Sequence, residues 1–330
     1  MASFSEWGNN LHTGKTSINF VGRRKVWYLI AGILIVLSVT LPWLRGGFQF
    51  GIEFSGGSEF RVEQVTDTSD LTIAEDAVTS VVPAANPRVT VVGDSSVRIQ
   101  TDQLSDDETL EIKENLATAY DVNADEVNSS FIGATWGADI TGMALRALVI
   151  FMALATVVMA LYFRTWKMSL SAMIALVHDL VITAGVYGIL GFEVTPAAVI
   201  GFLTILGYSL YDTVVVFDKI RENTSEDGAE SRRTFAESVN LAVNQTLVRS
   251  INTSVVAVLP VASILFIGAF VLGAGTLRDI SLALFIGILV GTYSTIFIAA
   301  PAYAHLRGTE EEIKKQTKRT LALRAAAAAE

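Results

Sequence analysis

The sequence contains no cysteine and little charge. The absence of cysteine from its 330 residues excludes disulfide bonds, thiolate metal sites and a cysteine nucleophile. Its 3 histidines, His12, His178 and His305, are scattered, so a histidine-based metal cluster is not expected. Charged residues make up 17% of the chain, against about 25% in an average soluble domain. The net charge of −9 argues against nucleic acid as a partner.

Sequence signatures of common enzyme classes are also missing. The chain has no Walker A phosphate-binding loop, no Gly-x-Ser-x-Gly nucleophile motif and no His-Glu-x-x-His metal motif. Each of these motifs supplies groups that bind a nucleotide, attack an acyl substrate or hold a catalytic zinc ion. We therefore expect a protein that is not an enzyme, with no catalytic residues, no metal site and no cofactor.

Long apolar segments dominate what is present. Hydrophobic residues make up 51% of the chain, and its mean hydropathy is +0.48. A helix needs about 20 apolar residues to cross a bilayer. The sequence predicts six spans, at 26–44, 143–163, 169–190, 195–217, 250–273 and 279–303. Basic residues precede the first span, as in a signal peptide, but its apolar run exceeds the usual length of about 7–15 residues, so we expect a retained helix.

Basic residues indicate the orientation of the spans. Most Lys and Arg residues lie in the N-terminal segment 1–25, the loops around 164–168 and 218–249, and the tail 304–330. Few lie in the segments on the opposite side. Because basic loops stay in the cytoplasm, we expect both termini to be cytoplasmic. Residues 45–142 then form one external domain, and residues 143–303 contain the remaining five membrane helices.

The external segment has fold signals of its own. It carries 18 acidic and 5 basic residues, which is typical of a solvated surface. A Ser or Thr followed three residues later by Glu predicts helix starts at Thr72 and Ser105. Alternating apolar residues predict strands around these helices, which places elements at 57–65, 72–82, 88–92, 97–101, 105–120 and 127–133. This β-α-β-β-α-β order predicts an α+β ferredoxin-like domain.

Three charged residues lie within or beside the predicted spans. Asp179 is near the middle of the third span, next to His178. Asp212 is in the inner half of the fourth span, and Arg249 is at the inner end of the fifth. Ionisable residues at membrane depth are costly and usually functional. One interpretation is a proton pathway, in which Arg249 moves toward or away from Asp212. The alternatives are a structural ion pair between two helices and, for His178, a packed polar residue.

Glycines are frequent in the third and fourth predicted spans. They are Gly185, Gly188 and Gly191 in the third and Gly201 and Gly207 in the fourth. Small residues let membrane helices approach closely. These two spans are therefore predicted to pack tightly, either within the chain or against a second six-span chain.

Four segments carry a resemblance to a known family. They are 50–57 (FGIEFSGG), His178–Asp179, 207–223 (GYSLYDTVVVFDKIREN) and 244–250 (NQTLVRS). Together they resemble the SecF family, the smaller membrane subunits of the bacterial SecDF protein-export accessory complex. The resemblance extends over residues 15–305, and 207–223 is its most specific part. Tyr211 departs from the pattern, in which Asn is expected beside the Asp.

This resemblance implies an architecture, partners and site residues. SecF-like chains are polytopic α-helical membrane proteins of the resistance-nodulation-division (RND) superfamily, with six transmembrane helices and one external ferredoxin-like domain. They pair with a SecD subunit beside the SecYEG channel in the bacterial plasma membrane, often with the small protein YajC, surrounded by lipid. They are thought to use the proton-motive force to assist unfolded exported polypeptide at the late, outer-side stage of translocation. By motif position, the family's functional Asp falls on Asp212 and its functional Arg on Arg249, with protons as the coupling ion.

Two other functions fit parts of the sequence. One half of an RND-type exporter of small molecules would use the same membrane charges, but such exporters usually carry larger external domains with a substrate pocket. A non-transporting scaffold of the translocon would explain the external domain, but it would leave Asp212 and Arg249 without a role.

Overall fold

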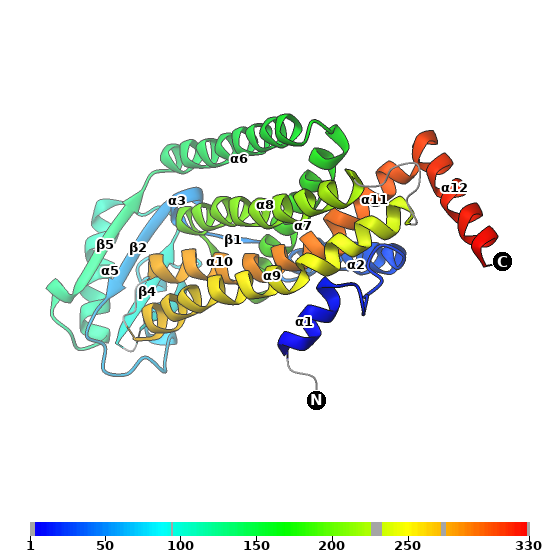
Figure 1. The fold of residues 1–330 in the computed structure, drawn as a ribbon. Coiled ribbons are helices and arrows are strands. Elements are labelled where there is room, and N and C mark those ends of the chain that lie inside the picture. Colours follow the sequence, from blue (N-terminus) through cyan, green and yellow to red (C-terminus); the bar gives the residue numbers. More distant parts are fainter. Residues whose placement is uncertain (1–3, 94, 226–232, 272–274, 329–330) are drawn as a thin grey trace.

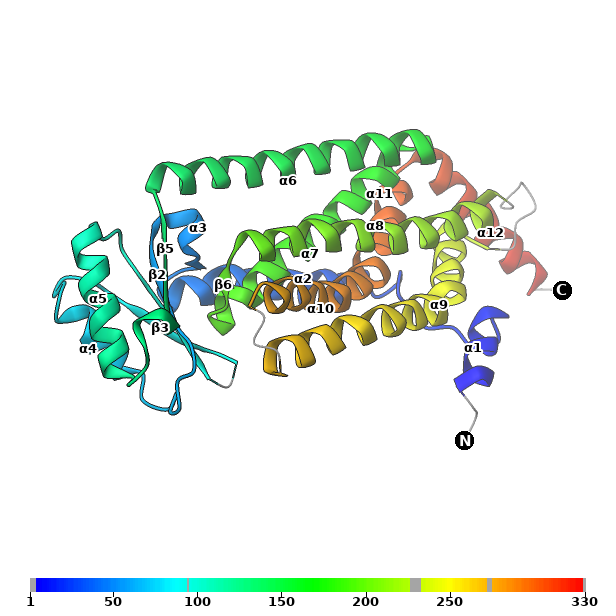
Figure 2. The same ribbon diagram turned by 90° about the vertical axis from the view of Figure 1, so that its left-hand side faces the viewer.

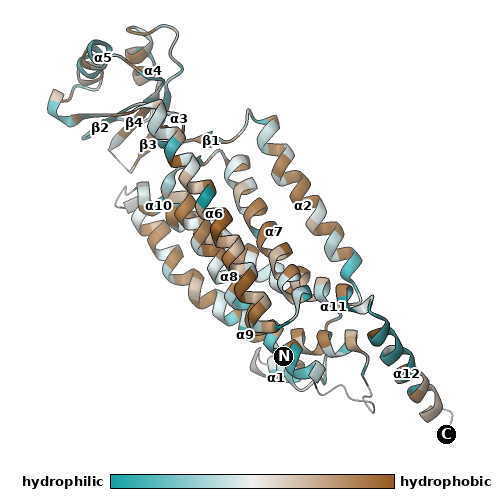
Figure 3. Ribbon diagram, turned by 90° about the horizontal axis from the view of Figure 1, so that it is seen from above, coloured by the Kyte–Doolittle hydropathy of each residue, from teal (hydrophilic) through white to brown (hydrophobic). Residues whose placement is uncertain are grey.

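The structure is a computed structural model that describes residues 4–93, 95–225, 233–271 and 275–328. It has two parts, a bundle of long helices and a small α/β domain at one end of that bundle (Figure 1). Helices α1 (Phe4–His12) and α12 (Glu311–Ala327) lie at the other end (Figures 2 and 3). The first and last helices therefore lie on the same side of the bundle.

Within the described residues, six helical segments are long and apolar enough to span a membrane. The first four are α2 (Arg24–Leu44), α6 (Ala134–Phe163), α7 (Trp166–Leu190) and α8 (Pro196–Ser225). The fifth joins α9 (Phe235–Ser263) to the π-helix η2 (Ile264–Val271). The sixth runs through α10 (Gly275–Ser294), the π-helix η3 (Thr295–Ala299) and α11 (Ala300–Gly308). The prediction of six membrane helices is confirmed, and Figure 3 shows their apolar residues in brown.

Two of these helices begin earlier than the sequence analysis placed their spans. Helix α6 begins at Ala134 rather than at residue 143, and α9 begins at Phe235 rather than at residue 250. The start of α9 is a capping box, in which the side chains of Thr234 and Glu237 each accept a hydrogen bond from the other residue's backbone N–H. Because a cap can start a helix in a polar segment, hydropathy located only the apolar part of α9. Arg249 therefore lies well inside the helix.

Helices α7 and α8 occupy the centre of the bundle. Within the most apolar stretch of each helix, 56% of α7 and 44% of α8 is buried, against 11% of α6 and 17% of α2. Helix α6 runs along the edge of the bundle (Figures 1 and 2). The buried side of α7 includes small residues such as Ser171, Ala172 and Ala175, which allow close approach of its neighbours. Polar groups on the buried faces of α7 and α8 are therefore enclosed by protein.

The glycines of these helices pack inside the chain. A methyl group on Gly185 would lie 2.6 Å from the Cα of Ser38 in α2, and one on Gly188 would lie 2.6 Å from a ring carbon of Pro42. Gly201 of α8 faces Ala283 of α10 at a similar distance. The close packing predicted for the third and fourth spans is thus accounted for by contacts with α2 and α10.

The small domain contains one four-stranded antiparallel sheet. Its elements are β2 (Gly57–Val62), α4 (Thr72–Thr79), β3 (Arg88–Val92), β4 (Ser96–Thr101), α5 (Asp106–Ala119) and β5 (Val127–Ile132), and the strand order is β3-β4-β2-β5. In the central pair, Phe60 lies opposite Ile99, and both are fully buried with Ile112 and Leu116 of α5. This order and topology confirm the predicted ferredoxin-like domain.

Both predicted helix starts in this domain are confirmed, but only one of them has the predicted capping box. Ser105 forms the predicted capping box with Glu108. Helix α4 begins at Thr72 as predicted, but the capping box does not form there: Leu71 occupies the N-cap position without a side-chain cap, and the hydroxyl of Thr72 donates to Asp70 at 2.6 Å. The carboxylate of Asp70 accepts from both the backbone N–H and the hydroxyl of Thr72, so this hydroxyl is engaged with Asp70.

Two short strands connect the small domain to the helices. Strand β1 (Gln49–Phe50) pairs in parallel with β6 (Glu193–Val194), which lies between α7 and α8. The short helix α3 (Ile52–Ser55) follows β1. The first connection from α2 into the small domain is therefore held against the α7–α8 turn.

The close contact between α2 and α7 leads to a stability prediction. Gly185→Ala should lower the free energy of unfolding in detergent by about 1–3 kcal/mol, because the added methyl group overlaps Ser38. Gly32→Ala, on α2, is the matched control: nothing lies within 4 Å of a methyl group there, and helix propensity favours alanine. Thermal unfolding of both variants tests this, and equal midpoints would contradict the packing described here.

Candidate functional site

Asp212 lies inside the bundle, on α8. Its side chain is 4% exposed, and its Oδ1 accepts a hydrogen bond of 2.9 Å from the hydroxyl of Ser250 on α9. Its Oδ2 is buried and finds no hydrogen-bond partner among the residues that the structure describes. An ionised carboxylate in these surroundings needs a cation or a further donor. The geometry therefore leaves one side of Asp212 open to a proton or to a charged partner.

Arg249 does not pair with Asp212 in this arrangement. It is exposed on the surface of α9, and among the described residues no ion pair joins it to Asp212. Neighbouring residues on a helix point in directions about 100° apart. Because Ser250 faces Asp212, the side chain of the preceding Arg249 leaves α9 about 100° around the helix from that contact. The structural ion pair considered above is absent here, although the two residues lie on adjacent helices.

Asp179 connects three helices. It lies on α7 and is 1% exposed. Its Oδ2 accepts hydrogen bonds from Ser209 on α8 at 2.6 Å and from Ser294 on α10 at 2.8 Å. A methyl group on Gly291 would lie 3.1 Å from Ser209, so glycine leaves room for this contact. With two donors on one oxygen, Asp179 is held more firmly than Asp212.

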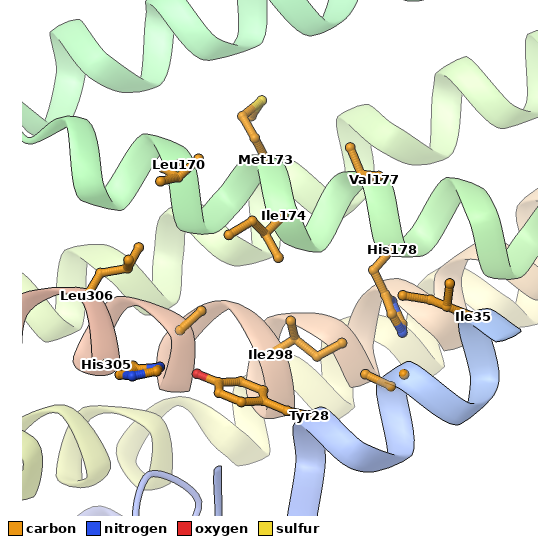
Figure 4. Close-up of a pocket in the computed structure, with 13 residues that line it drawn as sticks. Tyr28, Ile35, Leu170, Met173, Ile174, Val177, His178, Ile298, His305 and Leu306 are labelled. Atoms are coloured by element: carbon orange, nitrogen blue, oxygen red, sulfur yellow. The ribbon is translucent and has the colours of Figure 1, made fainter. Parts of the chain in front are cut away.

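His178 lies between Asp179 and a cavity. Its Nδ1 is 3.2 Å from Oδ1 of Asp179, whereas its Nε2 is buried and finds no partner in the described ranges. The ring borders a cavity of about 650 Å³ between α2, α7 and α11, with Tyr28 and His305 also on its wall (Figure 4). The lining is otherwise apolar, so His178 is the polar group that the cavity offers near Asp179.

Hydroxyl side chains surround both aspartates, and they were not among the site residues predicted from the sequence. Thr213 bonds Thr295 at 3.0 Å, and Ser254 bonds Thr292 at 2.5 Å. The hydroxyl of Ser254 also contacts the Ser250 carbonyl at 2.8 Å. Small hydroxyl residues within apolar segments are the signal that could have revealed this, since they supply donors without the volume or charge of larger polar residues.

A further buried acid, Asp279, lies at the end of the bundle nearest the small domain. Its Oδ2 accepts from Thr195 at 2.8 Å, its backbone carbonyl accepts from Tyr187 at 2.8 Å, and Arg278 lies 3.4 Å from its Oδ1. Its position at the start of a span gave no sign that it would be buried. Across the residues that the structure covers, no group of three or more His, Asp or Glu side chains is arranged to hold a metal ion.

Comparisons with known proteins place the chain among export proteins. The family model described as protein export membrane protein SecD/SecF, C-terminal, matches residues 112–309. The protein translocase subunit SecF of Streptomyces coelicolor is 46% identical over 332 residues, which cover 100% of this chain and 87% of that protein. The SecF subunit of Mycobacterium tuberculosis is 40% identical over 323 residues, covering 95% of this chain and 72% of that protein.

Two solved structures with a similar fold are also export proteins. The crystal structure of SecDF from Thermus thermophilus, described as a translocon-associated membrane protein, superimposes with a TM-score of 0.75 at 28% identity, covering 89% of this chain and 39% of the other. A crystal structure of SecDF in a super-membrane-facing form gives a TM-score of 0.60 at 27% identity, covering 92% and 40%. This chain therefore aligns with less than half of each SecDF chain.

The contacts of Asp179 predict a coupled effect on stability. Ser209→Ala and Ser294→Ala should each lower the free energy of unfolding by about 1–2 kcal/mol, because each removes a buried donor to the same carboxylate. Their effects should not add, since both act through Asp179. Ser171→Ala is the control, because Ser171 donates only within its own helix, to the carbonyl of Lys167. Denaturant unfolding in detergent measures all four variants. An additive double variant would exclude the shared role of Asp179.

Proposed function

Since the chain belongs to the SecF family of protein translocase subunits, we propose that it uses the proton-motive force to assist protein translocation at the late, outer-side stage. In this proposal Asp212 binds and releases the coupling proton, and Arg249 responds to the charge of Asp212. The exported polypeptide is met by the small domain, which lies outside the membrane. The chain acts beside the SecYEG channel in the plasma membrane, with both of its ends in the cytoplasm.

The observation that carries this proposal is the half-satisfied carboxyl group of Asp212. One oxygen accepts from Ser250 and the other is buried without a partner. In its neutral form the group can stay in these surroundings. In its ionised form it requires a cation, because an unpaired charge at membrane depth is costly. Binding and loss of a proton at Asp212 therefore favour two different arrangements of its surroundings.

Arg249 is placed to provide that cation. It precedes the hydrogen-bond partner of Asp212 on α9, so a rotation of α9 by about one residue's angle would turn its guanidinium toward Asp212. Helix α9 contains Pro260 and continues into the π-helix Ile264–Val271. Both features interrupt regular helical hydrogen bonding and support local rearrangement. The structure described here would correspond to the arrangement with a neutral Asp212.

The exposed surface of α8 and α9 supports a SecD-like chain as the partner. Tyr211, beside Asp212, is 56% exposed, and Val256 on α9 is 68% exposed, on the helix that also exposes Arg249. An arginine at membrane depth is rarely left facing lipid. The translocase subunit SecDF of Thermus thermophilus is matched over 40% of its length, so most of that longer chain lies outside the match. We place a six-span SecD-like subunit against α8 and α9.

The proton-coupling role is tested by substitutions at Asp212. Asp212→Asn should abolish proton-dependent export, at least about tenfold below the wild type, while the complex still assembles, because the amide oxygen can still accept from Ser250. Asp212→Glu should retain part of the activity. Asp218→Asn is the control, since Asp218 lies farther along α8, toward its C-terminal end, and accepts from Tyr162 at 3.0 Å. Export of a reporter protein and proton flux in vesicles, together with complex yield, are the measurements.

Arg249 distinguishes coupling from a structural role. Arg249→Met should block export without loss of complex, and Arg249→Lys should be intermediate because the charge remains but the planar guanidinium is lost. A purely structural pair would instead lower the yield of each single variant, and the double neutral variant would recover. Full proton-dependent export by Asp212→Asn would refute the role assigned to Asp212.

The partner surface is tested by cross-linking, which is straightforward because the chain has no cysteine. Tyr211→Cys should form a disulfide cross-link to a cysteine series in the fourth and fifth helices of a co-expressed SecD-like chain. Leu154, on the edge helix α6, is 61% exposed, slightly more than Tyr211, and Leu154→Cys should give no cross-link. Cross-linking from position 154 but not from 211 would place the partner on α6 instead.

A further inference from the structure

An ion pair joins the small domain to the helical bundle. Arg98, on β4, pairs with Glu193 of β6, between α7 and α8. The side chain of Arg98 is 15% exposed and that of Glu193 is 8% exposed. The Nε of Arg98 also lies 3.7 Å from Oε2 of Glu59 on β2. Because the pair crosses between the two parts of the molecule, its strength bears on how firmly they are held together.

A second carboxyl group shares this junction. Glu53 lies on α3, in the connection that leads from β1 into the small domain. Its Oε2 and Oε1 of Glu193 are both buried, and neither finds a hydrogen-bond partner in the part of the chain that the structure describes. A methyl group placed on Gly51 would touch Oε2 of Glu53 and lie 3.3 Å from Oε1 of Glu193. The two unpartnered oxygens therefore border one small space, which glycine leaves open.

The surrounding charges favour one proton in this space. Two ionised carboxylates so close together repel each other, and one of them is then best kept neutral. Arg98 already compensates Glu193, so Glu53 is the group left to hold the proton. Burial, above all, raises the pKa of the Glu53 carboxyl above its usual range. The negative charges of Glu59 and Asp279 raise it further, while its own backbone N–H and Arg98 oppose the shift.

We propose that Glu53 and Glu193 form a proton-binding site that holds the small domain against the membrane helices. When the proton is bound, Glu53 is a neutral carboxylic acid and its O–H group donates a hydrogen bond to Oε1 of Glu193. When the site is empty, the O–H bond has broken and the proton has passed to water at the outer surface. Four carboxylates, those of Glu53, Glu59, Glu193 and Asp279, then face two guanidinium groups, those of Arg98 and Arg278. The excess negative charge weakens the docking of the domain.

The direction of the pH effect follows from linkage. The docked arrangement binds the proton more tightly than the free one, so docking is favoured below the pKa of the exposed carboxyl and weakens as pH rises through the docked value. One proton can change the docked-to-undocked ratio by at most about tenfold per pH unit. A more acidic outer side therefore keeps the domain docked. This inference rests on the proposed function only for the external position of the domain, and not for proton coupling at Asp212.

Distances between spin labels test the proposal in the full chain with its SecD-like partner, in lipid nanodiscs. Labels on Asn86→Cys in the small domain and Thr276→Cys at the start of α10 are at exposed positions, and the chain has no native cysteine that would react. The fraction at the docked distance is measured from about pH 5 to about pH 9, a range that spans raised carboxyl pKa values. The wild type should undock as pH rises.

Three variants are measured in the same spin-label titration as the wild type. Glu53→Gln should stay docked with no pH dependence, because the amide donates permanently to Glu193. Glu193→Gln should lose or reverse the slope, because Arg98 is then free to pair with an ionised Glu53. Glu63→Gln, a control at a half-exposed acid paired with Arg61, should titrate as the wild type does.

Two results would overturn the site: a wild-type docked fraction independent of pH, or a Glu53→Gln or Glu193→Gln slope equal to that of the wild type. If Glu53→Gln cannot be purified, the Glu193→Gln slope alone decides. The measurement needs neither export nor proton flux. A failure here therefore leaves the test of Asp212 untouched, and loss of export in Asp212→Asn leaves the junction to be judged by its own titration.

Discussion

A polar side chain within the hydrocarbon layer must find its partners inside the protein, and the arrangement of the helices depends on this constraint. Asp179 and Asp212 can be carried on α7 and α8 because those helices lie at the centre of the bundle and are enclosed by α2, α9 and α10. Serine and threonine hydroxyls on the neighbouring helices supply donors to the two aspartates. Glycines on the same helices bring those hydroxyls within reach. The small residues therefore make the buried aspartates tolerable, because close packing of the helices brings hydroxyl donors to them.

The two aspartates differ in how completely their hydrogen-bonding groups are satisfied. Asp179 has two hydroxyl donors on one oxygen and His178 beside the other. Asp212 has one donor and an open oxygen. A fully bonded carboxylate resists change, whereas a half-bonded one responds to a proton or to an approaching cation. A similar arrangement occurs outside the membrane spans, where Arg98 pairs with one oxygen of Glu193, while the other oxygen of Glu193 and Oε2 of Glu53 are left without partners.

Much of this fold could be predicted because the signals are local. Apolar runs identified six spans. Strand patterns of alternating apolar residues, in β-α-β-β-α-β order with two helices, identified the ferredoxin-like domain. The errors were local as well. The pattern at Thr72 resembles that at Ser105, but a neighbouring acceptor, Asp70, decided its outcome. The polar start of α9 is invisible to hydropathy, because a cap and backbone hydrogen bonds extend the helix without apolar side chains.

The sequence by itself determined which residues carry charge at membrane depth, since Asp179, Asp212 and Arg249 stand out against apolar surroundings whatever the packing. Their relations were decided only by the tertiary structure. The rotation of α9 puts Ser250 rather than Arg249 against Asp212, and the pairing of β1 with β6 brings Glu53 to Glu193 across about 140 residues of chain. Helix rotation and strand pairing arise from the sum of many packing contacts, and no short stretch of sequence encodes that sum.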